Sequence, residues 1–334
     1  MFKKFVSAVL VFFFAAFFLC GCTPKRNTVN SGDKLNIVCT VFPEYDWCRE
    51  ILGKYKKNVS LTYLLGDGID MHHYQPDADA VNKIKNCDIL MYVGGESEKW
   101  VDEALAQVPN NNITVINLLA ILGDSAIELE RERVRSRKAL DPVEETTEPT
   151  TIPEPLYEEH PWLSLKHAQT FCTEIADVIC QYDPNNADYY KSNLDSYINK
   201  LAALDKEFRL MFNDCKKHAL IFGDRYPFSY FEADYNILCY APFPTCGTAA
   251  TAQYDDIVAL AKQVDYFKTH VVYILESSDT TIADAIIENT TVSNQRIEVL
   301  NSAQSVTSKQ AEKGMSYLSI MLGNYDIIEG ALNQ

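Results

Sequence analysis

The sequence lacks the short motifs by which many enzymes and small zinc domains are recognised. It has no Gly-x-Ser-x-Gly elbow, no His-Glu-x-x-His helix and no Walker loop, so no common hydrolase or nucleotidase signature is present. It also has no Cys-x-x-Cys pair, which argues against a zinc ribbon or a thioredoxin-type redox site. Histidine is scarce, with 6 residues in 334. The chemistry of the protein must therefore be sought outside these motif classes.

Positive charge is also in short supply. The chain has 30 Lys and Arg against 46 Asp and Glu, a net charge of −16. Such a chain repels phosphates, which argues against nucleic acid as a partner. It suits a cationic cargo, although an acidic surface more often serves only solubility. Hydrophobic residues make up 47% of the chain, which is enough to build the cores of two domains of ordinary size.

The N-terminus has the pattern of an export signal. Lys3 and Lys4 precede an uncharged run that ends in Leu-Cys-Gly-Cys at Cys22. The run is about 15 residues long, too short for a comfortable membrane span. Its end resembles a bacterial lipobox, which predicts a signal peptide over 1–21 and lipidation of Cys22; an uncleaved anchor helix is the alternative. We expect residues 22–33 to be a flexible tether, with the protein on the outer face of the bacterial cytoplasmic membrane or in the periplasm.

Eight cysteines follow Cys22. Export permits disulfides, but most of these residues lie within apolar strand or helix patterns, which favours buried free thiols. They are Cys39, Cys48, Cys87, Cys172, Cys180, Cys215, Cys239 and Cys246.

Two sets of short apolar runs predict two α/β halves. Near-continuous apolar strands separated by helical patterns indicate sheets that are covered on both faces. The eight expected strands are 35–41, 59–65, 88–94, 113–118, 218–223, 236–242, 270–276 and 296–301. We therefore expect a first lobe over 34–184 and a second lobe over 216–334, each with four strands.

One long helix is expected between the lobes, over 185–215. Tyr190, Leu194, Tyr197 and Leu201 recur at three- and four-residue spacing after a Pro-Asn start, which predicts an amphipathic helix. About 27 helical residues span roughly 40 Å. A spine of this length resists hinging, so we expect any closure of the lobes to be small.

An acidic segment, 141–159, stands apart from this pattern. It carries seven acidic residues, four prolines and no basic residue, and such a composition does not fold alone. We expect a mobile loop with little contact with either core.

The histidines point to a metal site. His72 and His73 follow an expected strand, and His160 follows the acidic segment. In α/β proteins, ligands bind in loops at the carboxyl ends of strands, and imidazole is a ligand for zinc and similar metals. His218 and His270 begin strands at the opposite ends and are interpreted as solvated or capping residues.

Four blocks of sequence resemble one family. They are "GDGIDMHHYQP" (66–76), "EEHPWLSLKHAQ" (158–169), "GDRYPFSYFEADYNI" (223–237) and "GMSYLSIMLGNYDIIEGAL" (314–332). In this order they resemble the zinc-uptake component A-like proteins, the cluster A-I solute-binding proteins that supply zinc and manganese ABC transporters. The resemblance implies an exported binding protein and not an enzyme, with two α/β lobes, a long linking helix and an ABC permease as partner.

Only some of the family's metal-ligand positions hold a suitable residue in this sequence. It implies His72 and His160 as ligands, but the usual third and fourth slots hold Arg225 and Asn301. Arginine does not bind a cation and an amide is a weaker ligand than a carboxylate.

Three other residues could complete the shell: Asp224, Glu276 or His73. Two imidazoles with carboxylates accept Zn²⁺ or Mn²⁺, with a lean toward zinc. A metal-dependent hydrolase, an adhesin and a metal sensor on the same scaffold stay open as alternatives.

Overall fold

The computed structural model describes residues 34–108, 112–129, 156–214, 219–243, 246 and 252–332. The expected signal peptide, the tether with Cys22, residues 141–155 of the acidic segment and His218 lie outside these described residues. Within the described residues, no helix is both long enough and apolar enough to cross a membrane.

The first lobe is built on a four-stranded parallel sheet in the order β2-β1-β3-β4. Its strands are β1 (Leu35–Cys39), β2 (Val59–Tyr63), β3 (Ile89–Tyr92) and β4 (Thr114–Asn117). Ile37 of β1 lies opposite Leu61 of β2 and Ile89 of β3, and both β1 and β3 are almost wholly buried. The continuous apolar runs arise because helices cover both faces of this sheet.

Among the described residues, five helices pack around the sheet. They are α2 (Phe42–Leu52), α3 (Ala78–Lys85), α4 (Lys99–Leu105), α5 (Leu118–Leu122) and α7 (Leu165–Tyr182). On one face, Val38 and Leu90 form a buried cluster with Ile84 of α3 and Val101 of α4. On the other face, the Sγ atom of Cys48 in α2 lies 3.3 Å from the Sδ atom of Met91.

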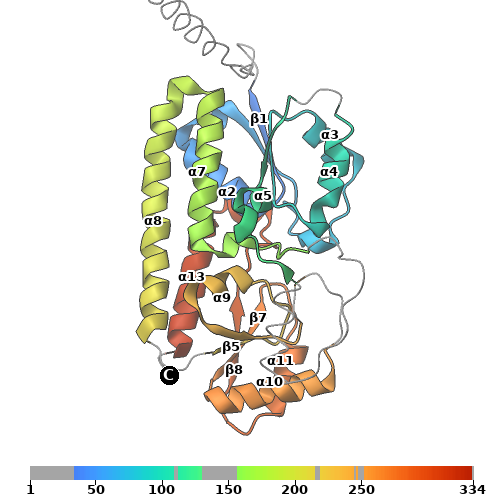
Figure 1. Cartoon of the computed structure of the whole chain (residues 1–334), viewed down its shortest axis with the longest axis vertical. Coiled ribbons are helices and arrows are strands. Elements are labelled where there is room, and N and C mark those ends of the chain that lie inside the picture. The colour runs from blue at the N-terminus through green and yellow to red at the C-terminus, as the bar shows by residue number, and fades with distance from the viewer. Residues whose placement is uncertain are drawn as a thin grey trace, which may run out of the picture. The chain divides into compact units, whose positions relative to one another are not determined.

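Helix α8 (Ala187–Asp214) is a single element of 28 residues, about 42 Å long at 1.5 Å per residue. The predicted continuous helix is confirmed. It runs alongside α7 (Figure 1) and contacts α2 in the first lobe and α9 in the second. Its buried face carries Tyr190, Leu194, Tyr197 and Leu201, so the apolar stripe read from the sequence is the packing surface.

The second lobe has the four expected strands, in two parallel pairs: β5 (Ala219–Ile221) with β6 (Leu238–Tyr240), and β7 (Val271–Leu275) with β8 (Arg296–Leu300). A bridge between Phe222 and Tyr273 joins the pairs. The ladder is thus less continuous than in the first lobe. A side chain at Gly223 would lie 2.6 Å from the Cα atom of Ala283, so glycine lets helix α11 (Thr281–Glu288) pack against the end of β5.

Five helices complete the second lobe: α9 (Ser229–Tyr235), α10 (Tyr254–Phe267), α11 (Thr281–Glu288), α12 (Ser308–Glu312) and α13 (Tyr317–Leu332). Helix α13 returns to the first lobe, where it packs on α2 as well as α8. The backbone N–H of Tyr317 donates to the buried Asp46 carboxylate at 2.7 Å, and Arg49 donates to the carbonyls of Ala311 and Met315. These contacts fix the loops of both lobes relative to each other.

Candidate metal centre

His72 lies on a short turn after β2. The turn, Met71–His73, is a single 3₁₀ turn, and Met71 anchors it in the core. The Asp70 carboxylate accepts the backbone N–H of His72 at 3.0 Å, which caps the turn. His72 therefore points inward, with its side chain 4% exposed, whereas the neighbouring His73 side chain is 64% exposed.

His160 is held by a buried aromatic turn, Pro161–Leu163. Trp162 packs against the His160 ring with 5.2 Å between ring centroids, and its indole N–H donates to the Ser302 carbonyl at 2.8 Å. The Tyr317 hydroxyl donates to the Trp162 carbonyl at 2.5 Å. Two groups of the second lobe thus fix the position of a first-lobe histidine.

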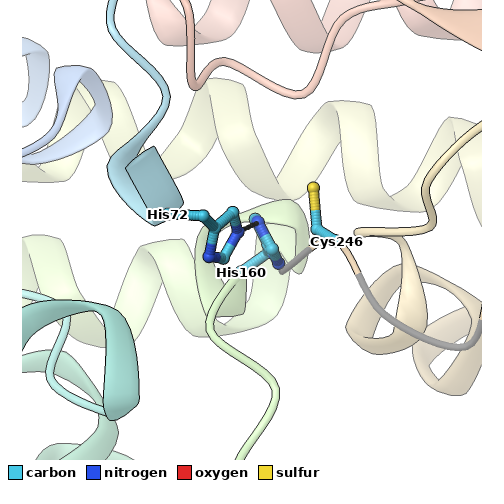
Figure 2. Close-up of side chains that lie close together, drawn as sticks. All are labelled: His72, His160 and Cys246. Atoms are coloured by element: carbon cyan, nitrogen blue, oxygen red, sulfur yellow. Dashed lines mark hydrogen bonds between the residues drawn. The ribbon is translucent and has the colours of Figure 1, made fainter. Parts of the chain in front are cut away.

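The rings of His72 and His160 face each other, with 3.1 Å between their Nε2 atoms (Figure 2). The Nδ1 atom of His72 lies 2.7 Å from the Ser97 hydroxyl, which donates to Glu159 at 2.5 Å. The Nδ1 atom of His160 is hydrogen-bonded to Glu158. Proton acceptors at both Nδ1 positions favour the tautomer in which Nε2 carries the lone pair, the usual arrangement of metal-binding histidines.

The two glutamates correct our expectation for the acidic segment. Glu158 and Glu159 are 1% and 7% exposed, and the backbone N–H of Glu158 donates to the Ile127 carbonyl at 2.9 Å. The Tyr230 hydroxyl donates to the Glu158 carbonyl at 3.2 Å. The expectation of little contact with a core is therefore wrong for residues 156–159, because buried imidazole partners hold these carboxylates in place.

Cys246 is the residue that sequence reasoning missed. It comes from the second lobe, is 2% exposed, and lies beside His160 (Figure 2). One ligand atom from each of His72, His160 and Cys246 lies within 4.8 Å of the others. We call these three residues the His–Cys cluster. A signal did exist: Cys246 stands in a Pro-Thr-Cys-Gly loop after a strand, where no apolar pattern accounts for it.

Charge around the His–Cys cluster favours ionised groups. Burial alone raises the pKa of the Cys246 thiol, but hydrogen bonds and positive charge from His160 and His72 lower it to about 7. Burial lowers the pKa of His72, but hydrogen bonds with Cys246 and Glu159 raise it to about 9. For His160, burial is outweighed by the Glu158 carboxylate, and the pKa is raised well above its usual value. At 3.1 Å the two Nε2 atoms are close enough together for one cation to bind both.

The structure does not bring Asp224 or Glu276 into this cluster. The Asp224 carboxylate accepts the backbone N–H groups of Leu275 at 2.8 Å and Arg225 at 2.7 Å. Glu276 accepts the N–H and hydroxyl of Ser302, each at 2.8 Å. Both carboxylates are used to shape the loops at the ends of β5, β7 and β8.

The residues in the usual third and fourth slots also have structural partners. Arg225 forms an ion pair with Asp70 at 2.7 Å between Nη1 and Oδ2, which links the second lobe to the capped turn of His72. The Asn301 side chain accepts the backbone N–H of Ala303 at 2.8 Å. Two imidazole nitrogens and one sulfur are left facing one point, a donor set for a borderline-soft cation.

Fold and site together define a two-lobed α/β receptor with a buried group of metal-ligating side chains where the lobes meet. Residues 37–331 match the family described as zinc-uptake complex component A, periplasmic. The chain belongs to this family. That description names a periplasmic component of a zinc-uptake complex.

Named relatives resemble the chain in sequence, and solved structures share its fold. The chain is 28% identical over 341 residues to the high-affinity zinc uptake system protein ZnuA of Bacillus subtilis, covering 99% of each. It is 26% identical to the zinc-binding lipoprotein AdcA of Streptococcus pneumoniae, covering 96% of this chain but 59% of that protein. The crystal structure of the Zn(II)-bound ZnuA-like domain of AdcA covers 90% of this chain, with a TM-score of 0.68 and 23% identity. The periplasmic zinc-binding protein TroA of Treponema pallidum also has a TM-score of 0.68, over 90% of this chain at 18% identity.

Proposed function

We propose that this protein captures a divalent transition metal, zinc in the first place and manganese in the second, and delivers it to an ABC permease for uptake. One observation carries the proposal: the Nε2 atoms of His72 and His160 lie 3.1 Å apart while both Nδ1 atoms have hydrogen-bond partners. Two nitrogens on one tetrahedral zinc ion lie about 3.3 Å apart, since each bond is about 2.05 Å long. Both rings thus already stand close to the positions that a shared ion requires.

The names of the relatives support this cargo. The Bacillus subtilis relative is named for high-affinity zinc uptake, and the Streptococcus pneumoniae relative for zinc binding. Manganese is the second candidate because a periplasmic metal-binding protein of the same fold, from Candidatus Liberibacter asiaticus, is described as Mn-bound. The protein acts by binding and releasing the metal and not by catalysis, since the members of its family are components of an uptake complex.

Attachment to the membrane is part of the same proposal. Cys22 at the end of the Leu-Cys-Gly-Cys sequence would be the lipidated first residue of the mature chain, which places the protein on the outer face of the cytoplasmic membrane. The name of AdcA as a lipoprotein supports it. Mass spectrometry of the mature N-terminus tests it: an unmodified terminus, or cleavage well past Cys22, contradicts the assignment.

Zinc titration of metal-free protein tests the function. A ligand that binds only the folded state stabilises it by about 4 kcal/mol at 1,000 times its dissociation constant. We expect zinc to raise the melting temperature of the wild type, and His72→Ala and His160→Ala each to lose most of that shift. His73→Ala is the matched control, because that side chain is 64% exposed, and should keep the shift.

Two results would count against the proposal. Absence of any shift in the wild type, with zinc and with manganese, removes metal capture as the function. Equal losses in His72→Ala and His73→Ala show that the ligand in this turn is wrongly assigned.

A further inference from the structure

Among the His, Cys, Asp and Glu side chains of the described residues, the second lobe presents one ligand atom to the two histidines, and it is sulfur. Cys246 Sγ belongs to the group whose atoms lie within 4.8 Å of one another, and the residue is 2% exposed. The described residues of that group include no carboxylate, because Asp224 and Glu276 are bound to backbone amides and a serine hydroxyl. A hard oxygen donor from the second lobe is therefore replaced by a soft one.

The surroundings of the sulfur suit a thiolate. The Gln304 side-chain amide donates to Sγ at 3.5 Å, and Gln304 is itself buried at 4% exposed. Arg225 lies close enough for its charge to interact with that of Cys246, while its guanidinium is oriented by Asp70 at 2.7 Å. An amide donor and a cation beside a buried sulfur both stabilise negative charge on it.

We propose that Cys246 is the third protein ligand of this site and that its thiolate restricts the cargo to thiophilic divalent cations of the zinc type, with manganese disfavoured. The inference rests on the proposed function, since it names the cargo class of the same site. Thiolate ligands favour zinc, whereas manganese favours carboxylate, carbonyl and water oxygens. When the cation binds, a bond forms between Sγ and the metal, and any thiol proton leaves to solvent.

Cobalt(II) substitution reads the ligand directly in the full-length protein. A thiolate bound to cobalt gives a charge-transfer band in the near ultraviolet, which imidazole and carboxylate ligands do not give. We expect this band in the wild type and in Cys180→Ser, and its loss in Cys246→Ser. Cys180 is the matched control because it is a partly exposed thiol on α7 outside the His–Cys cluster.

Competition between zinc and manganese tests the cargo class. We expect Cys246→Ser to weaken zinc binding by about 100-fold or more, since removing even a hydrogen-bond partner of a ligand costs about 10- to 100-fold. Manganese binding should change far less. Cys246→Asp, which supplies an oxygen ligand, should shift the preference toward manganese relative to the wild type.

The two proposals fail in different ways. If the wild type binds zinc through His72 and His160 but shows no cobalt charge-transfer band, and Cys246→Ser keeps its zinc affinity, the thiolate inference is overturned and the function stands. If the wild type binds neither metal, the proposed function falls and the inference falls with it. The band in the wild type does not depend on the folding of any variant, so its absence overturns the thiolate inference even if a substitution destabilises the chain.

Discussion

The acidic side chains that lie nearest the His–Cys cluster serve different purposes in the two lobes. In the first lobe, Glu158 and Glu159 point at imidazole rings, directly or through Ser97. In the second lobe, Asp224 and Glu276 accept backbone N–H groups at the ends of strands. The first lobe thus prepares its ligands with carboxylates, while the second lobe uses carboxylates to hold its own loops and presents sulfur.

This difference shows that a carboxylate near a metal site need not be a ligand. A buried carboxylate is stable only if its charge is compensated by hydrogen bonds or a cation. Asp224 obtains two backbone N–H groups within 2.8 Å, so it is satisfied without a metal. Glu158 is satisfied by its ion pair with Nδ1 of His160. A metal would leave this contact in place, because it would bind Nε2, the opposite nitrogen of the ring. Both arrangements leave the cargo position to nitrogen and sulfur.

The largest effect that we expect is a loss of stability when a carboxylate of the second lobe is removed. It would sharpen the contrast between the carboxylates of the two lobes. Asp224→Ala leaves the N–H groups of Leu275 and Arg225 without their acceptor, and we expect the free energy of unfolding of the metal-free protein to fall by about 3 kcal/mol. Zinc affinity should stay close to that of the wild type. Denaturant unfolding and zinc titration measure the two quantities.

Asp177→Ala serves as the control for that change, because Asp177 is exposed on α7, and it should alter neither quantity. The comparison between the lobes breaks if Asp224→Ala loses zinc binding while its stability is unchanged, since Asp224 would then be a ligand.

The fold was predictable because its signals are local and repeated. Each expected strand overlaps an observed one, and the stripe at Tyr190, Leu194 and Tyr197 is the buried face of α8. Apolar periodicity is set by which side chains face the core, so it is readable without knowledge of distant contacts. The bridge between Phe222 and Tyr273, which joins the two pairs of strands in the second lobe, has no such local signal.

The site was predictable only where the local sequence fixes it. His72 and His160 stand in recognisable turns, so the sequence predicts both as ligands, but Glu158 lies at the end of a segment whose composition indicates disorder. Its burial depends on Ile127 and Tyr230, which are far away along the chain. Cys246 reaches the histidines only through the arrangement of the second lobe, so a single sequence gives no reason to pair it with them.

A smaller effect is expected when a carboxylate of the first lobe is changed. It should lower the affinity for zinc and leave the loops of the lobe unaffected. In Glu158→Gln the amide oxygen still accepts from His160 Nδ1, but the negative charge that strengthens the imidazole as a ligand is lost. We expect zinc affinity to fall by about 10- to 100-fold, measured by titration against a competing chelator. Glu96→Gln is the control, because that carboxylate is 59% exposed and forms an ion pair with Lys99.

An unchanged affinity in Glu158→Gln would show that the carboxylate stabilises the fold and not the ligand, which would remove the contrast between the lobes.

The smallest effect concerns the ion pair between Arg225 and Asp70, which joins the second lobe to the first. Arg225 and Asp70 are 2.7 Å apart and partly exposed, at 25% and 15%, so the pair is worth about 1 kcal/mol or less. In Arg225→Gln, Asp70 can still cap the His72 turn, since a different oxygen accepts the backbone N–H. We therefore expect the turn to keep its shape, the free energy of unfolding to fall by about 1 kcal/mol, and zinc to leave faster, because the second lobe is held less firmly over the histidines. Zinc release into excess chelator in a stopped-flow instrument measures the rate.

Arg296→Gln removes an ion pair within β8 at 2.6 Å and is the matched control. If it accelerates zinc release as much as Arg225→Gln does, the ion pair between the lobes has no special part in retaining the metal.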